Sequence, residues 1–212
     1  MVPVTSVTLQ VKNRKSLFHK LIDKKSITFS TDGKIVACIG SNATGKTTFL
    51  RLIEDAVSKK KTGNVKCGIN LLNGQVYSST VHINDVPELL KFEPEKYSKF
   101  SNILDYIKLS KRLLDLKMFR ASEGECASYY FEDFYTDNLD LLISGKPFIV
   151  LINEPENYLD PKTLQSFLIA IKSWVNNNSY NSNGQIFITT HSLFVIDAAD
   201  IVIEFEPNYK HE

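Results

Sequence analysis

The sequence has few cysteines and no long apolar segment, and both absences exclude classes of protein. Its 212 residues contain three cysteines, Cys38, Cys67 and Cys126, which are scattered and lack the spacing of metal ligands. We therefore expect reduced thiols in a cytoplasmic protein. No apolar run approaches the ~20 residues of a membrane-spanning helix, and the first residues lack the charged segment and apolar core of a signal peptide. We expect no membrane insertion.

An excess of charge of one sign is also missing. The chain has 25 Lys and Arg residues against 24 Asp and Glu residues, which gives a net charge of +1. No overall field therefore favours a nucleic acid or an anionic membrane. Hydrophobic residues make up 43% of the chain, which is ordinary for a globular protein and ample for a sizeable core. The length suits one domain, and we predict a single domain over residues 1–212.

Short apolar runs alternate with amphipathic segments along the chain. The run Ile35–Ile39 is continuously apolar, as expected of a strand covered on both faces. Residues 45–59 and 161–175 instead place apolar side chains at helical spacing. Strands that alternate with helices predict an α/β fold with a mostly parallel core sheet. Strands are predicted at residues 5–11, 26–30, 34–39, 148–152, 185–189 and 201–205, with an antiparallel portion of short strands over 65–83 around the turn Asn73-Gly74.

Two further features complete the predicted architecture. Residues 86–115 are polar but carry enough leucine and isoleucine to pack as helices, and residues 126–143 are typical of a helix rich in aromatic side chains. We therefore predict a small helical subdomain over about residues 86–143. A short helix is expected at 191–199, and the strands near the two termini are expected to pair antiparallel.

The stretch from Gly40 to Thr47 fits the pattern G-x-x-x-x-G-K-[ST], after a buried strand and before an amphipathic helix. A triphosphate is a polyanion, and a loop can hold it where main-chain N–H groups point inward without Cβ clashes. The helix amino end adds positive potential. Lys46 would reach the β- and γ-phosphates, and Thr47 would ligate Mg²⁺. The predicted nucleotide-binding residues here are Gly40, Ser41, Asn42, Ala43, Thr44, Gly45, Lys46, Thr47 and Thr48.

Four more polar stretches follow the loop in the sequence. They are Ser122-Glu123-Gly124-Glu125, the strand-like IVLINEP with Glu154, Tyr158-Leu159-Asp160, and Thr189-Thr190-His191-Ser192. Most of these stretches also have a purely structural interpretation. Ser122 with Glu125 fits a capping box, Asp160 before a proline fits an N-cap, and His191 fits a surface or helix-cap histidine. Glu154 is harder to dismiss, because a carboxylate directly after an apolar strand is costly to bury without a partner.

The order of these stretches resembles that of the ATP-binding cassette (ABC) ATPases, over roughly residues 1–206. The Ser-x-Gly-Glu form of the signature motif is more similar to the RecF and SMC branch than to transporters. The resemblance implies that Glu154 is the catalytic base and that His191 contacts the γ-phosphate or the attacking water. It implies that Ser122 and Gly124 complete the ATP site of a second copy, so that ATP joins two copies head to tail, and that Asp160, in the D-loop stretch, is a nucleotide-binding residue.

The sequence departs from that family pattern at three positions. Asn153 stands where the family has an aspartate near Mg²⁺, and an amide keeps an acceptor oxygen but loses a negative charge. Ala43 stands where glycine is common, which tightens the loop's geometry. No glutamine marks the family's Q-loop, and Asn84 is the best positional candidate for that metal contact. We therefore expect ATP binding with Mg²⁺, and hydrolysis that is slow or dependent on a partner.

Several functions remain open from the sequence. The first is a RecF/SMC-like ATPase in DNA repair, maintenance or defence that acts with a separate effector protein, with DNA as a candidate ligand. The second is the nucleotide-binding subunit of an ABC membrane transporter, which the small size favours and the signature motif disfavours. A third is an ATP-gated regulatory switch that barely turns over. The sequence identifies neither the partner nor a base-reading motif.

Overall fold

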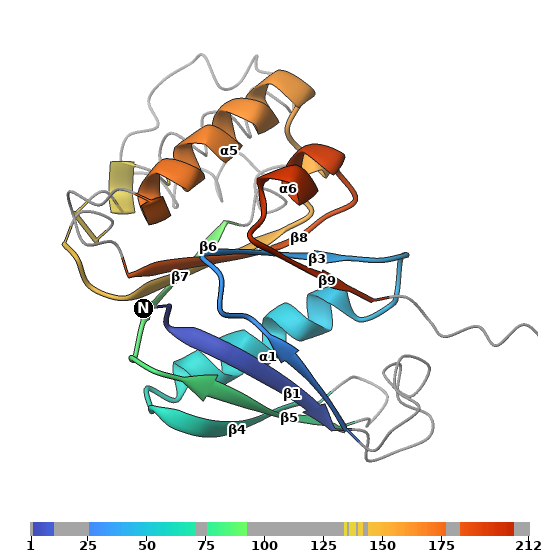
Figure 1. The fold of residues 1–212 in the computed structure, drawn as a ribbon, viewed down its shortest axis with the longest axis vertical. Helices are drawn as coiled ribbons and strands as arrows, with labels where there is room; N and C mark the ends of the chain where they lie inside the picture. The colour runs from blue at the N-terminus through green and yellow to red at the C-terminus, as the bar shows by residue number, and fades with distance from the viewer. Residues whose placement is uncertain are drawn as a thin grey trace, which may run out of the picture.

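The computed structural model describes residues 2–10, 26–70, 76–92, 144–176 and 183–205, together with residues 134, 136–138, 140 and 141. These residues form two sheets, one of five strands and one of four. Figure 1 shows the layers: helix α1 (Lys46–Ser58) lies between the two sheets, and helices α5 (Pro161–Asn176) and α6 (Leu193–Ala198) cover the other face of the larger sheet. The sequence prediction of an α/β fold is confirmed.

The five-stranded sheet is parallel throughout, in the order β6-β7-β8-β3-β9. Its central strands are mostly apolar because both faces are covered. The expectation that the strand nearest the carboxyl terminus pairs antiparallel is wrong, since β9 runs parallel to β3. The strands are β3 (Ile35–Ile39), β6 (Glu88–Phe92), β7 (Phe148–Asn153), β8 (Gly184–Thr189) and β9 (Ile201–Glu204).

The four-stranded sheet is antiparallel, in the order β2-β1-β5-β4. Its strands are β1 (Val4–Gln10), β2 (Ser26–Ser30), β4 (Gly63–Asn70) and β5 (Val76–Ile83). Helix α1 buries Phe49, Leu52, Ile53 and Ala56 against this sheet and the parallel sheet together. The apolar stripe that predicted the helix packs against both sheets and so fixes the position of α1. Because the phosphate loop leads directly into the amino end of α1, the position of the loop is fixed as well.

A second apolar core lies under α5 and α6, on the other face of the parallel sheet. Leu164, Phe167, Ile171 and Val175 of α5 are buried there among residues of β7 and β8. Two covered faces explain why the carboxyl ends of the strands, rather than the faces of the sheet, are where polar side chains gather.

The predicted helical subdomain begins later than expected. Residues 88–92 form strand β6 beside β7, where the sequence prediction had helix. Leu90 and Phe92 pack into the core under α5, and this pairing with an apolar neighbouring strand outweighs a weak helical preference. The few described residues between 134 and 141 are helical, as predicted. The remainder of the predicted subdomain lies outside the described residues and stays a prediction.

The described cysteines and helices can be compared with the expectations of reduced thiols and of no membrane-spanning segment. Cys38 and Cys67 are buried free thiols, and burial raises the pKa of each, so neither is a reactive thiolate. Among the described residues, no helix is both long enough and apolar enough to cross a membrane.

Candidate nucleotide-binding and catalytic site

Three neighbouring strands of the parallel sheet end in polar loops at one edge. β7, β8 and β3 are adjacent in the sheet, so the residues after Asn153, Thr189 and Ile39 meet at their carboxyl ends. Main-chain bonds tie these loops together: the N–H of Glu154 donates to the carbonyl of Thr189 at 2.9 Å, and the N–H of Thr190 donates to the carbonyl of Cys38 at 3.0 Å. Ligands of open α/β sheets collect at such an edge.

The loop between β3 and α1 needs its glycines. Gly40 has a φ of 137°, and a Cβ there would lie 2.3 Å from the carbonyl oxygen of Phe205. Gly45 has a φ of 107°. Ala43 also lies in the left-handed region, with a φ of 62°. This is a conformation that glycine adopts more easily than alanine does. Thr44 stabilises the turn by donating its hydroxyl to the carbonyl of Ser41 at 2.8 Å.

Helix α1 begins without a cap. Gly45 at the N-cap has no side chain to accept from the first turn, and no acidic residue follows in that turn. The main-chain N–H groups at the start of a helix have no partner within the helix. Their positive potential is therefore left for an anion bound at this end of α1.

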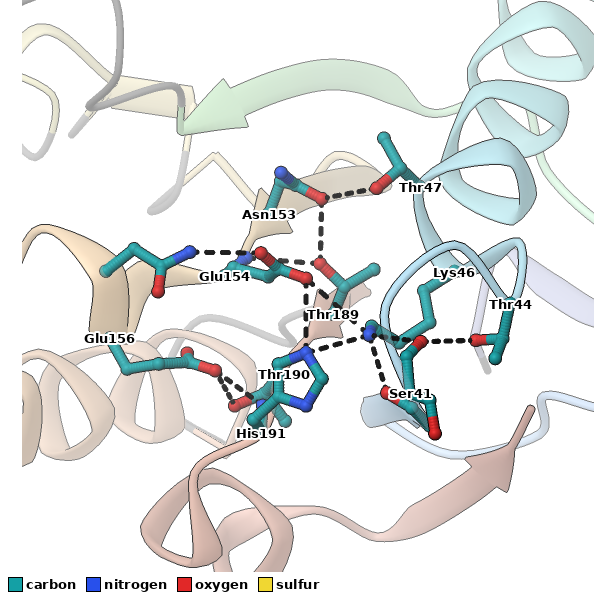
Figure 2. A network of polar contacts seen from close by, with 12 residues as sticks. Ser41, Thr44, Lys46, Thr47, Asn153, Glu154, Glu156, Thr189, Thr190 and His191 are labelled. Atoms are coloured by element: carbon teal, nitrogen blue, oxygen red, sulfur yellow. Dashed lines mark hydrogen bonds and ion pairs between the residues drawn. The ribbon is translucent and has the colours of Figure 1, made fainter. Parts of the chain in front are cut away.

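Lys46, the first residue of α1, is at the centre of the site (Figure 2). Its side chain is 4% exposed, and its ammonium donates to the carbonyls of Gly40 at 2.7 Å and Ser41 at 3.2 Å. It also lies 2.9 Å from His191 Nε2 and 3.6 Å from Glu154 Oε1. Because an ammonium can only donate, His191 Nε2 accepts in this contact, which puts the ring proton on Nδ1.

Asn153 links the end of β7 to α1 and to β8. Its amide oxygen accepts from the hydroxyl of Thr47 at 3.1 Å and from the hydroxyl of Thr189 at 2.8 Å. Both bonds would be available to an aspartate at this position as well. The arrangement therefore supports the sequence interpretation that Asn153 occupies the place of an acid.

Glu154 follows with a left-handed backbone, φ 44° and ψ 59°, which is costly for a residue other than glycine. The conformation is held by Thr189, whose carbonyl and hydroxyl both accept from the Glu154 N–H, the latter at 3.1 Å. Asn157 donates its side-chain amide to Glu154 Oε2 at 3.0 Å. The other carboxylate oxygen lies toward Lys46 and His191, at 3.6 and 3.5 Å. Backbone and side chain together aim this acid at the phosphate loop.

The donor set fits a magnesium ion that arrives with a nucleotide. Thr47 and Asn153 supply neutral oxygen atoms, which suit Mg²⁺ but bring no charge. No group of three or more His, Cys, Asp or Glu side chains that could hold a metal occurs among the described residues. The negative charge at this position would therefore come from the phosphates.

Asp160 is the N-cap of α5. Its carboxylate accepts from the N–H groups of Lys162 at 3.0 Å and Thr163 at 3.2 Å, and from the Thr163 hydroxyl. Hydrogen bonds from the Thr163 side chain and then from these N–H groups hold the pKa of Asp160 below its ordinary value. The structure thus shows the capping role that the sequence offered as an alternative. A contact from Asp160 to a nucleotide stays a prediction.

Asn84 does not join the site. Its N–H donates to Pro3 and its side chain to the carbonyl of Val2 at 3.2 Å, and the adjacent Val4 contacts Gln185 near the start of β8. Asn84 therefore lies at the amino end of the parallel sheet, opposite Thr47 and Asn153, and its assignment as a metal ligand needs correction. The strand that does reach the site edge is β6, whose Phe92 pairs with Ile152.

Of the other predicted residues, Ser122 and Gly124 lie outside the described residues, and Ser41, Asn42 and Thr48 lie in or just after the loop. Three residues with clear positions in the site were not assigned roles from the sequence. Thr189 holds Asn153 and Glu154, Asn157 contacts Glu154, and Glu156 accepts from the loop of His191. The sequence signal that could have identified them is the concentration of polar residues directly after two buried strands.

Comparisons with known proteins show which proteins the chain resembles. A family model described as "AAA domain, putative AbiEii toxin, Type IV TA system" matches residues 86–197, just over half of the chain. The ribosome protection protein VmlR of Bacillus subtilis is 25% identical over 224 residues, which cover 99% of this chain and 33% of that protein. The chain thus spans about a third of the length of this curated relative.

Two solved structures share the fold. The SmcHead bound to the C-winged helix domain of ScpA has a TM-score of 0.53 at 10% identity, over 95% of this chain and 93% of that chain. The ADP conformation of an ATP-binding cassette of an ABC transporter has a TM-score of 0.52 at 13% identity, over 95% of this chain and 87% of that chain. At these identities the likeness concerns the fold alone.

Proposed function

The chain belongs to the AAA domain family whose model matches just over half of it; we propose that it is an ABC-type P-loop ATPase of the RecF/SMC-like branch that binds ATP with Mg²⁺, hydrolyses it slowly and couples this cycle to a partner. The observation that carries the proposal is the contact of Lys46 with Glu154 and His191 at the uncapped start of α1. Three side chains from three loops meet where a terminal phosphate would be held.

The contacts of Lys46 suggest how a nucleotide would change the site. Its ammonium now donates to neutral carbonyls and to His191, and phosphate oxygens are stronger acceptors for the same protons. Transfer of Lys46 to the β- and γ-phosphates would release His191 Nε2 and Glu154 Oε1. Glu154 would then polarise the attacking water, and His191 would contact the γ-phosphate or that water. Magnesium bound at Thr47 and Asn153 would neutralise charge on the phosphates.

The missing charge at Asn153 is the reason for proposing slow turnover. The amide keeps the bonds to Thr47 and Thr189, so the geometry of the edge survives. What it lacks is a carboxylate whose negative charge would lie close to the metal, at a partly exposed position where one charge still contributes to metal binding. Slow turnover suits a protein whose ATP-bound state must last long enough to act on a partner.

The catalytic part of the proposal is tested with Glu154→Gln. General bases typically contribute on the order of 10²- to 10⁴-fold, so the turnover number should fall by a factor in that range while nucleotide affinity changes by a few-fold at most. Titration with a fluorescent nucleotide and a phosphate-release assay measure the two quantities. Glu88→Gln, which alters an exposed glutamate at the opposite end of the sheet, is the matched control. Unchanged turnover in Glu154→Gln would remove Glu154 from the chemistry.

The same variant tests the proposed head-to-tail dimer. A complex that forms with ATP and not without it has a stability that depends on nucleotide concentration. Glu154→Gln should keep ATP bound, so light scattering after size exclusion should show dimers with Mg²⁺ and ATP and monomers without. A monomer at high protein concentration with saturating ATP would contradict the dimer, and the ATP site would then have to work within one copy.

We propose a RecF/SMC-like role in DNA maintenance or defence, with a separate effector protein, as the setting of this cycle. The family description names a toxin of a Type IV toxin–antitoxin system, which supports defence over transport. ATP-dependent retention on DNA with a steep dependence on salt would support contact with nucleic acid. Co-purification with a multi-span membrane protein would instead select the transporter alternative. Co-sedimentation with ribosomes would instead favour ribosome protection, the role named for the Bacillus subtilis relative.

A further inference from the structure

Glu156 bridges the turn after Glu154 and the loop of His191 (Figure 2). It lies in the short 3-10 helix η3 (Pro155–Asn157), directly after the proposed base. Its Oε1 accepts from the hydroxyl of Thr190 at 2.9 Å and from the main-chain N–H of His191. Its Oε2 is buried and makes no hydrogen bond within the described part of the chain. The hydrogen bonds seen for this carboxylate therefore all go to one loop.

The bond to Glu156 acts together with other contacts that shape the loop of His191. The hydroxyl of Thr190 also accepts from the N–H of Ser192 at 2.9 Å, so the bond to Glu156 orients a group that shapes the next turn. On the other side, the N–H of Thr190 is bound to the carbonyl of Cys38. The side chain of His191 is 43% exposed, so packing alone does not fix the ring. Its position therefore depends on its contacts with Lys46 and Glu154 and on how the main chain at 190–192 is held.

We propose that Glu156 is a positioning residue for His191. A carboxylate that accepts a main-chain N–H makes a charge-assisted bond, stronger than a bond between neutral groups. Through it, the turn that carries Glu154 and the loop that carries His191 are joined as one unit, so the acid and the histidine keep their separation when Lys46 moves to a phosphate. The inference rests on the proposed function, since it assumes that His191 acts at the terminal phosphate.

The first test compares Glu156→Ala with Glu88→Ala, which alters an exposed glutamate at the amino end of the sheet. Misplacement of a catalytic group by about 1 Å can cost on the order of a hundredfold in rate, so turnover in Glu156→Ala should fall roughly ten- to a hundredfold. Nucleotide affinity should stay within about twofold, because Lys46 and the phosphate loop are intact. Unchanged turnover beside an active wild type, or an equal loss of turnover and affinity, would overturn the positioning role.

A double-mutant cycle with His191→Ala separates positioning from general destabilisation. If Glu156 acts through His191, then Glu156→Ala should have little further effect on turnover once the imidazole is absent. Full additivity of the two losses would contradict the proposal. Glu156→Gln keeps an oxygen that can accept from the His191 N–H, so it should recover part of the lost turnover, although it places an amide group where Oε2 is buried.

Amide hydrogen exchange tests the same link without any nucleotide. The His191 N–H is protected by Glu156 in the folded protein, so its exchange should become faster in Glu156→Ala and remain slow in Glu88→Ala. A wild type that binds no ATP would sink the proposed function, and faster exchange would still establish that Glu156 holds the loop. Identical His191 exchange in the wild type and Glu156→Ala would sink the inference while leaving ATP binding intact.

Discussion

Helices α1 and α5 both begin at the carboxyl edge of the parallel sheet, yet their first turns are built in opposite ways. In α5, Asp160 accepts from two main-chain N–H groups and so neutralises the amino end of the helix. In α1, Gly45 offers no side chain, no acid follows in the first turn, and the first residue is Lys46. The start of α5 is capped by Asp160 of the same chain. The start of α1 instead carries the cation Lys46 at a terminus that is already positive.

This difference is the one expected between a helix that only supports the fold and a helix whose start binds an anion. A buried ammonium is costly unless it is paired, and Lys46 is only 4% exposed. Its charged neighbour is Glu154 at 3.6 Å, and its shorter contacts are to neutral acceptors. The positive charge at the start of α1 is therefore less completely neutralised than that at the start of α5, and a bound polyanion would neutralise it.

The largest effect is expected from Lys46→Ala, which removes the added cation from α1. A hydrogen bond to a charged group contributes about 1.5–3 kcal/mol, and about 1.4 kcal/mol corresponds to tenfold in affinity. Loss of two such bonds to phosphates should weaken ATP binding at least on the order of a hundredfold. Calorimetric titration with ATP and Mg²⁺ gives this value.

Lys162→Ala is the matched control, because Lys162 occupies the first turn of α5. Its side chain is exposed, and its N–H is already bound to Asp160. ATP affinity should not change in this variant. Equal losses in Lys46→Ala and Lys162→Ala would mean that the two helix starts do not differ as the geometry indicates.

A smaller effect is expected from Asn153→Asp, which gives the start of α1 an acid. The carboxylate would keep the bond from the Thr47 hydroxyl and add a negative charge near the proposed metal. At the effective dielectric constant of a partly exposed site, one added charge should tighten Mg²⁺-dependent nucleotide binding roughly tenfold. Magnesium titrations at fixed nucleotide concentration, with turnover measured in parallel, test this expectation.

Asn84→Asp makes the same chemical change at the opposite end of the sheet. Asn84 contacts Val2 and Pro3 and is far from the phosphate loop in the sheet, so its variant should leave magnesium dependence unaltered. If Asn153→Asp also leaves metal affinity and turnover unaltered, then Asn153 does not stand in for an acid and the explanation for slow hydrolysis is wrong.

The sequence predicted the parts of the fold in which local pattern and tertiary environment agree. The apolar runs of β3, β7 and β8 and the apolar stripes of α1 and α5 were identifiable because both sheet faces are covered. The strand β6 was missed because ELLKF is short and mixed, and its strand state comes from pairing with β7. The parallel direction of β9 likewise depends on its neighbour β3, which no local pattern records.

The candidate site shows the same division. Lys46 and Thr47 were identifiable from the pattern of the phosphate loop. Asn153, Glu154 and His191 were identified from the resemblance to the ABC ATPases, and the structure brings all five residues together at one edge. Asn84 was misplaced because it follows a strand of the antiparallel sheet, whose end lies at the other edge. The roles of Thr189 and Glu156 depend on which loops touch, and that is fixed by strand order rather than by sequence spacing.

The smallest effect is expected from Asp160→Asn, which alters the cap of α5 without removing it. The pKa of Asp160 is lower in the folded protein than the ordinary value of about 3.9. Its charge therefore stabilises the fold fully above that ordinary value, and the contribution is lost as pH falls through the lowered pKa. Asparagine also caps helices well, so the melting temperature of the variant should be slightly lower than that of the wild type at neutral pH and equal to it in strong acid.

This variant also decides between the two roles that the sequence left open for Asp160. If the residue only caps α5, ATP-dependent dimerisation on the Glu154→Gln background should be unaffected by Asp160→Asn, because the amide oxygen can still accept from Lys162 and Thr163. If dimerisation is lost while the melting temperature barely changes, the carboxylate must contact the second copy. In that case Asp160 would cap α5 in the monomer and contact the second copy in the dimer. The contrast between the starts of α1 and α5 would then hold only for the monomer.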